Sequence, residues 1–95
     1  MLLGEKLRKL REDAGQPQRR AAAALDIDTG TYCKIEKGRF LPNKGQIIML
    51  SDFYNCDKNE LIKLLLADKL IDVVKDEDLA GEAFVLAQDM LNIKK

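Results

Sequence analysis

The sequence predicts an all-α protein of six helices, and three observations support this class. Apolar residues recur at intervals of three and four along most of the chain. No segment alternates apolar and polar residues as a strand would. Residues suited to helix ends stand at the gaps between the periodic segments. The chain has 95 residues, of which 46% are hydrophobic, so we expect a compact helical core made mainly of Leu, Ile and Ala.

The first two helices are expected near the N-terminus. Residues 3–14 form the first, with Leu3, Leu7 and Leu10 on one face. The second begins at Pro17, because proline suits the first helical position, where its missing N–H has no partner anyway. Four consecutive alanines then continue this helix. They are strong helix formers, and their small side chains let a neighbouring helix approach closely.

The third helix is predicted between Asp28 and Gly38. Asp28 is a suitable N-cap, and glycine just past a helix end is the usual left-handed stop. Tyr32 and Ile35, three residues apart, belong to the buried face. The face left free to touch a ligand carries Thr29, Gly30, Thr31 and Lys34.

Three further helices complete the predicted order. A fourth, over residues 44–54, follows a loop marked by Pro42. Asp57 caps a fifth helix over residues 58–75. After a short acidic break, a sixth runs over residues 77–93.

Residues 18–38, QRRAAAALDIDTGTYCKIEKG, are the most informative segment. Two short helices joined by a tight turn are typical of a helix that enters a DNA groove and a smaller helix that holds it there. The segment resembles the helix-turn-helix of the phage-repressor and Cro-like family, also called XRE-type. The residues that carry the resemblance are Gln18, Ala22, Leu25, Ile27, Tyr32, Ile35, Glu36 and Gly38.

The resemblance extends over about two thirds of the chain, since residues 3–15 resemble the family's first helix and residues 42–62 its fourth and the start of its fifth. It implies a five-helix repressor-like helix-turn-helix domain with an extra C-terminal helix. We therefore expect a DNA-binding domain over residues 1–66 and a helical extension over residues 67–95.

The chain departs from the family pattern at two positions. Asp26 stands in the turn where glycine is usual, and Pro17 stands where a Ser or Asn cap is usual. Aspartate tolerates a left-handed backbone better than most residues, so the turn is expected to survive at some cost. Pro17 removes one N–H that could have met a phosphate.

The resemblance implies binding to double-stranded DNA. Thr29 and Lys34 are the expected base readers, since lysine can donate to guanine and threonine offers a hydroxyl or a methyl group; an ordinary exposed helix surface is the alternative. Gln18 is expected near phosphates and, by resemblance, a base, although a solvated helix-start glutamine fits as well. Gly30 either lets the backbone approach closely or contributes nothing. The full expected set is Gln18, Arg19, Thr29, Gly30, Thr31, Lys34, Lys37, Arg39, Asn43 and Lys44.

Within this set, the phosphate-contact candidates cluster around the motif and the loop after it, and each also fits a plain solvated side chain. They are Arg19, Lys37, Arg39, Asn43 and Lys44. By resemblance, Arg11 and Glu36 form an ion pair that ties the first helix to the end of the recognition helix. Cys33 stands where serine is frequent in the family and is expected to be a small spectator rather than a redox switch.

Charge is distributed unevenly, although the chain carries 16 basic and 16 acidic residues and no net charge. Residues 1–44 hold ten Lys and Arg against six Asp and Glu, whereas residues 45–95 hold six against ten. The basic half contains the helix-turn-helix motif. A duplex is densely negative, so we expect the acidic half to face away from DNA.

The last third of the chain has more apolar residues than a five-helix domain needs. Apolar positions surround the fifth helix, and the sixth adds a further stripe. The simplest explanation is a symmetric homodimer, with a longer intramolecular core as the alternative. The expected dimerisation residues are Leu65, Leu70, Val74, Leu79, Leu86 and Met90.

Several function classes fit poorly. The chain has no histidine, and Cys33 and Cys56 make no metal-ligand spacing, so no metal or cofactor is expected. No phosphate loop or nucleophile elbow argues for an enzyme, and the stacking aromatics of RNA-binding modules are missing. The longest apolar runs fall far below the ~20 residues that span a membrane. Without a secretory leader, a cytoplasmic protein with reduced thiols is expected.

The expected function is a sequence-specific, dimeric regulator of transcription, by default a repressor, on a near-palindromic operator. The alternative is an antitoxin-type protein or a restriction–modification controller that binds a partner protein through its C-terminal helices and regulates its own operon. A non-DNA adaptor that keeps the fold is a more remote interpretation.

Overall fold

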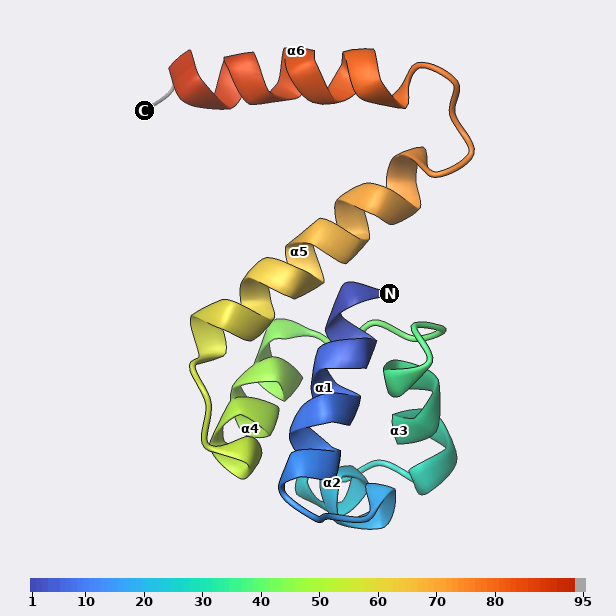
Figure 1. Cartoon of the computed structure of the whole chain (residues 1–95), viewed down its shortest axis with the longest axis vertical. Helices are drawn as coiled ribbons and strands as arrows, with labels where there is room; N and C mark the ends of the chain where they lie inside the picture. The colour runs from blue at the N-terminus through green and yellow to red at the C-terminus, as the bar shows by residue number, and fades with distance from the viewer. Residues whose placement is uncertain (94–95) are drawn as a thin grey trace.

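The structure, a computed structural model, describes residues 1–93, which form six α-helices and no strand. Residues 94–95 of the expected extension lie outside the described residues. The helices are α1 (Leu2–Asp13), α2 (Gln18–Ala24), α3 (Thr29–Glu36), α4 (Lys44–Tyr54), α5 (Lys58–Val74) and α6 (Ala80–Ile93). In Figure 1, α1 to α4 and the first half of α5 form one body, and α6 lies beyond it. The all-α prediction is therefore confirmed.

The core lies between α1, α2, α3, α4 and the first half of α5. Leu7, Ile47 and Leu61 have no exposed surface, and each comes from a different helix. Alanines at the centre of α2 let this helix pack closely against α3, as its composition predicts. The buried apolar residues are Leu3, Leu7, Ala21, Ala22, Leu25, Tyr32, Ile35, Ile47, Leu50, Leu61 and Leu65.

The helix ends follow the local chemistry of the chain. Asp28 caps α3 by accepting a hydrogen bond from the backbone N–H of Thr31 at 2.6 Å. Asp26 has a φ of 56°, so it takes the left-handed conformation that the motif requires in its turn. Gly38 ends α3 with a φ of 76°. Pro17 differs from expectation: it is the N-cap of α2 in extended conformation, and the first helical residue is Gln18.

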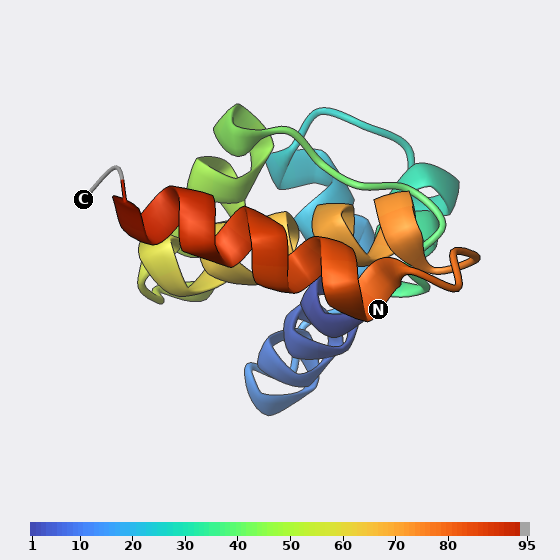
Figure 2. The same cartoon turned by 90° about the horizontal axis from the view of Figure 1, so that it is seen from above.

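The arm is defined here as residues 69–93, the exposed end of α5, the connecting turn and α6. The sixth helix begins at Ala80, not at residue 77 as expected, because residues 75–79 form turns. Leu79 therefore lies in the connection and not on a helical stripe. From above, α6 lies across the other helices (Figure 2), and every residue from 81 to 92 is exposed. The expected alternative of a longer intramolecular core is therefore wrong.

The head is defined here as residues 1–68, the part of the described chain that precedes the arm. One predicted dimerisation residue belongs to it: Leu65 is fully buried in the core, so its assignment to a subunit interface is wrong. Apolar residues surround α5, and periodicity alone does not separate the side facing the head from the sides facing solvent. The expected boundary between residues 66 and 67 falls inside α5, and the buried Asp68 still contacts α1.

Candidate nucleic-acid interface

The outer face of α3 is formed by the residues expected there. Thr29, Gly30 and Lys34 are exposed, and Thr31 is half-buried, while Tyr32 and Ile35 point into the core. The Asp28 cap fixes the start of this helix, and Gly38 sets its end. An 8-residue helix thus presents short side chains in its first turn and a lysine in its second.

Gly30 leaves one exposed position in the first turn of α3 without a side chain. A Cβ at this position would lie 3.4 Å from Asp28 Oδ1, which is ordinary contact. Packing therefore does not require glycine here. Because glycine inside a helix costs up to about 1 kcal/mol relative to alanine, its presence fits a role outside the fold, such as close approach of the α3 backbone to a ligand.

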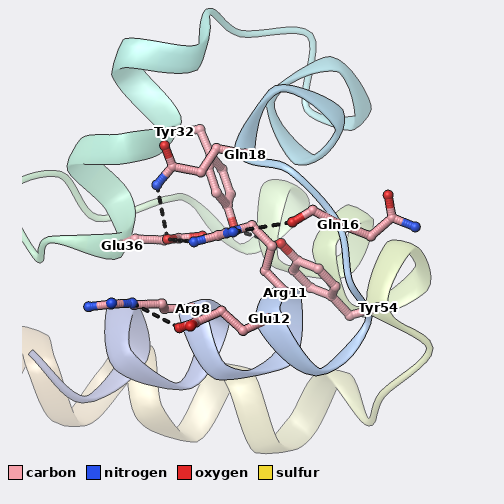
Figure 3. A network of polar contacts seen from close by, with 8 residues as sticks. All are labelled: Arg8, Arg11, Glu12, Gln16, Gln18, Tyr32, Glu36 and Tyr54. Carbon is pink, nitrogen blue, oxygen red and sulfur yellow. Dashed lines mark hydrogen bonds and ion pairs between the residues drawn. The ribbon is translucent and has the colours of Figure 1, made fainter.

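Arg11 and Glu36 form the ion pair that the resemblance implies. Arg11 Nε lies 2.7 Å from Glu36 Oε2, and its terminal nitrogen donates to Glu36 Oε1 at 3.0 Å. The pair is well shielded, with 16% of the Arg11 side chain and 4% of the Glu36 side chain exposed. Arg11 also donates to the Gln16 carbonyl, so it holds α1, the following loop and α3 together (Figure 3).

Gln18 joins this network and does not project freely. Its Nε2 donates to Glu36 Oε1 at 3.1 Å (Figure 3). Burial raises the pKa of Glu36, but hydrogen bonds from Arg11 and Gln18 outweigh this effect, so the pKa is lowered from its ordinary value. The Glu36 carboxylate in turn raises the pKa of Arg11 through its hydrogen bond. Both side chains therefore stay charged where α2 meets the end of α3.

Tyr32 and Tyr54 share a hydrogen bond of 2.7 Å between their hydroxyl oxygens. This bond links α3 to α4 behind the exposed face of α3, beside Arg11 (Figure 3). Burial raises the pKa of both phenols, so both stay protonated. The sequence predicts burial of Tyr32, but nothing in the spacing predicts its contact with Tyr54.

Four of the five phosphate-contact candidates are exposed cations, and none of the four forms an ion pair within residues 1–93. They are Arg19, Lys37, Arg39 and Lys44. Asn43, the fifth, has a structural role, because its side chain accepts from the Gln46 N–H while Gln46 Oε1 accepts from the Asn43 N–H. This reciprocal capping box starts α4. Asn43 with Gln46 three residues later is a readable signature that the sequence reasoning missed.

The structure brings some of these candidates together and separates others. Gln18 and Lys37 line one surface hollow of about 220 Å³, together with Arg8, Arg11 and Glu36. Its charged lining holds three cations and one carboxylate. Arg39 instead lines a hollow of about 390 Å³ between the N-terminus, the α3–α4 loop and Asp72 of α5.

The described residues contain neither a candidate metal site nor a candidate membrane-spanning helix. No group of His, Cys, Asp or Glu within residues 1–93 is placed to hold a metal ion. In the same part of the chain, every helix is too short or too polar to traverse a bilayer. Cys33 and Cys56 are both half-buried free thiols, and burial raises the pKa of Cys56.

Comparison with known proteins agrees with this geometry. A family model described as a helix-turn-helix domain matches residues 2–64, which covers α1 to α4 and the first part of α5. No curated protein and no solved structure gives a match. The matched region contains the capped α3, the alanine-rich α2 and the Arg11–Glu36 pair that joins α1 to α3. The chain belongs to the helix-turn-helix domain family, in agreement with its XRE-type resemblance.

Proposed function

We propose that this chain is a sequence-specific regulator of transcription that binds double-stranded DNA as a homodimer and represses a near-palindromic operator. The observation that carries the proposal is the exposed outer face of α3, where Thr29 and Lys34 project and Lys34 forms no ion pair within the described residues. In this proposal α3 lies in the major groove, Lys34 donates to guanine, and Thr29 offers its hydroxyl or methyl group.

The cations beside α3 support contacts to the DNA backbone. Arg19, Lys37, Arg39 and Lys44 are exposed, and each is free of an ion pair in the described chain. Phosphate contacts position a protein on the duplex without carrying sequence information. Gln18 has two roles in this proposal, since it donates a hydrogen bond to Glu36 and also lines the same surface hollow as Lys37, where its amide can approach a phosphate.

The arm supports the dimer. Leu70, Leu79, Leu86 and Met90 are each more than half exposed, and Val74 is half-buried. An open hollow of about 160 Å³ between α5 and α6 is lined only by apolar residues, among them Leu70, Val74 and Phe84. Exposed apolar patches of this kind mark association sites. A second copy is the occupant that suits a regulator whose operator has two half-sites about one helical turn apart.

Selection from a random duplex pool tests the DNA-binding proposal directly. Wild-type protein should enrich one motif with two related half-sites. A matched protein with Thr29→Ala and Lys34→Ala should keep the fold, because both side chains are exposed, and should lose that motif. Failure of the wild type to enrich any motif would contradict the proposal and favour the adaptor interpretation.

A second candidate rests on the acidic charge of the arm. Besides its apolar residues, the arm carries Asp72, Asp76, Glu77, Asp78, Glu82 and Asp89. Such a surface also suits a basic partner protein, as in an antitoxin or a restriction–modification controller that regulates its own operon. A toxin-like or methyltransferase reading frame beside the gene would favour this candidate over the homodimeric repressor.

A further inference from the structure

Asp68 caps a helix to which it does not belong. It lies on α5, and its side chain is fully buried. Its Oδ1 accepts from the Leu2 N–H and its Oδ2 from the Leu3 N–H, each at 2.9 Å. The N-cap residue of α1, Met1, supplies no side-chain cap. Two free N–H groups at the start of α1 are therefore satisfied by a carboxylate more than sixty residues away in the chain.

The contact of Asp68 with Leu2 and Leu3 fixes the position of α1 relative to α5. A buried carboxylate is costly unless its hydrogen bonds and local field compensate. Two backbone donors and the positive end of the α1 dipole supply that compensation here, and Asp68 forms no ion pair within residues 1–93. Because both oxygens are used, α1 cannot slide or rotate against α5 without losing a hydrogen bond to a buried group.

The same end of α1 touches the end of α3. A Cβ on Gly4 would lie 2.7 Å from the Ile35 carbonyl oxygen and would overlap that of Glu36, so the two backbones are in direct contact. A Cβ on Gly38 would meet the Met1 side chain. The last turn of α3 therefore packs directly against the N-terminal turn of α1.

We propose that Asp68 is a positioning residue for DNA binding: it fixes the start of α1, and α1 sets where the last turn of α3 lies. This inference rests on the proposed DNA-binding function. Asp68 is also the last buried residue of α5 before the arm. Any change in the arm that unwinds this turn of α5 thus reaches the recognition helix through Leu2, Leu3 and Gly4.

The test compares Asp68→Ala and Asp68→Asn with Glu60→Ala, an exposed acidic position about two turns earlier on α5. Affinities for the selected operator and for a random duplex are measured at a temperature where circular dichroism shows all proteins folded. Asp68→Ala should lower the operator-to-random affinity ratio by roughly 5- to 150-fold, the discrimination carried by one base contact. Asp68→Asn should recover part of the ratio, since its oxygen still accepts one N–H, and Glu60→Ala should match the wild type.

A purely structural role for Asp68 predicts a different outcome. Among folded proteins both affinities would then stay unchanged or fall by the same factor, the ratio would stay constant, and the inference would be overturned. Amide hydrogen exchange gives a readout without DNA: in Asp68→Asn, exchange should rise at residues 35–38 and stay unchanged in α4. Changes confined to α1 and α5 would refute the inference. Failure of the wild type to select DNA would refute the proposed function instead.

Discussion

The hydroxyl oxygens of Tyr32 and Tyr54 lie 2.7 Å apart, so α3 is hydrogen-bonded to α4 on the side opposite its exposed face. Tyr32 has no exposed surface, and its hydroxyl meets the Tyr54 hydroxyl and lies beside the Glu36 carboxylate. The bond therefore satisfies a polar group that water does not reach, and it adds a link from α4 to the part of α3 that the Arg11–Glu36 pair holds.

Tyr54→Phe should lower the free energy of unfolding by about 0.5–1.5 kcal/mol, because it removes a hydrogen bond of the buried Tyr32 hydroxyl. Urea denaturation followed by circular dichroism measures the change. The double variant Tyr32→Phe/Tyr54→Phe removes both hydroxyls and should be closer to the wild type than Tyr54→Phe alone. A double variant whose loss equals the sum of the two single losses would show that the hydroxyls do not interact.

Glu36 should make the free energy of unfolding depend on pH in the acidic range. Its pKa is lower in the folded protein than its ordinary value, so its contribution is fully present above about pH 4.5 and is lost as the pH falls through the folded-state pKa. The difference in unfolding free energy between wild type and Glu36→Gln should therefore stay constant from neutral pH down to about 5 and shrink below it. Glu12→Gln, in the exposed Arg8–Glu12 pair, should change the free energy of unfolding little over the whole pH range. A constant Glu36→Gln difference at all pH values would contradict the assignment.

Asp26→Gly should stabilise the protein by up to about 1 kcal/mol, because glycine takes a φ of 56° without the steric cost of a Cβ. Part of this gain is offset by the greater freedom of glycine in the unfolded chain. Thermal unfolding of Asp26→Gly and Asp26→Ala measures the effect, and the alanine variant should be less stable than the wild type. Equal melting temperatures for all three proteins would show that the turn stores no strain.

Lys34→Ala should weaken operator binding by ~1–3 kcal/mol and relax one base position, if the lysine reads a base as proposed. Arg39→Ala should instead lower affinity on all sequences alike and reduce the slope of log affinity against log salt concentration by about one. Competition binding on the selected and a random duplex at several salt concentrations separates the two effects. Equal losses on both duplexes for Lys34→Ala would assign this residue to the DNA backbone.

Leu86→Glu should convert the proposed dimer to a monomer without lowering the stability of the head. The side chain is 72% exposed in the single chain, so the charge disturbs no intramolecular contact, but it cannot be buried cheaply at a subunit interface. Sedimentation at tens of micromolar (a concentration suited to weak interfaces near −7 kcal/mol) measures the state of association. Leu65→Glu is the contrasting variant and should unfold the head, since Leu65 is in the core. A monomeric wild type would rule out the dimer.

Features set by neighbouring residues could be predicted from the sequence. Asp28, Asp57 and Gly38 mark helix ends through hydrogen bonds and backbone conformations that span only a few residues, and the structure has each where the sequence predicts it. The exposed face of α3 follows from the same reasoning, because the burial of Tyr32 and Ile35 fixes the rotation of the helix.

Features that depend on distant residues could not be predicted in the same way. In the sequence, Asp68 is one of several charges in a largely apolar predicted helix, and only the fold brings it to Leu2 and Leu3. Leu65 and Leu70 are equally apolar in sequence, yet one lies in the core and the other is 55% exposed. The contact between Gly4 and the end of α3 is likewise invisible to periodicity, although a glycine within a predicted helix is the signal that could have pointed to it.

The head completes its core without any side chain of α6 from residues 81–92. Substitutions on that helix consequently carry almost no folding penalty for the body that presents α3. Under the proposed function, substitutions on α6 would thus alter the choice of partner, and substitutions on the exposed face of α3 the choice of operator, each without affecting the other.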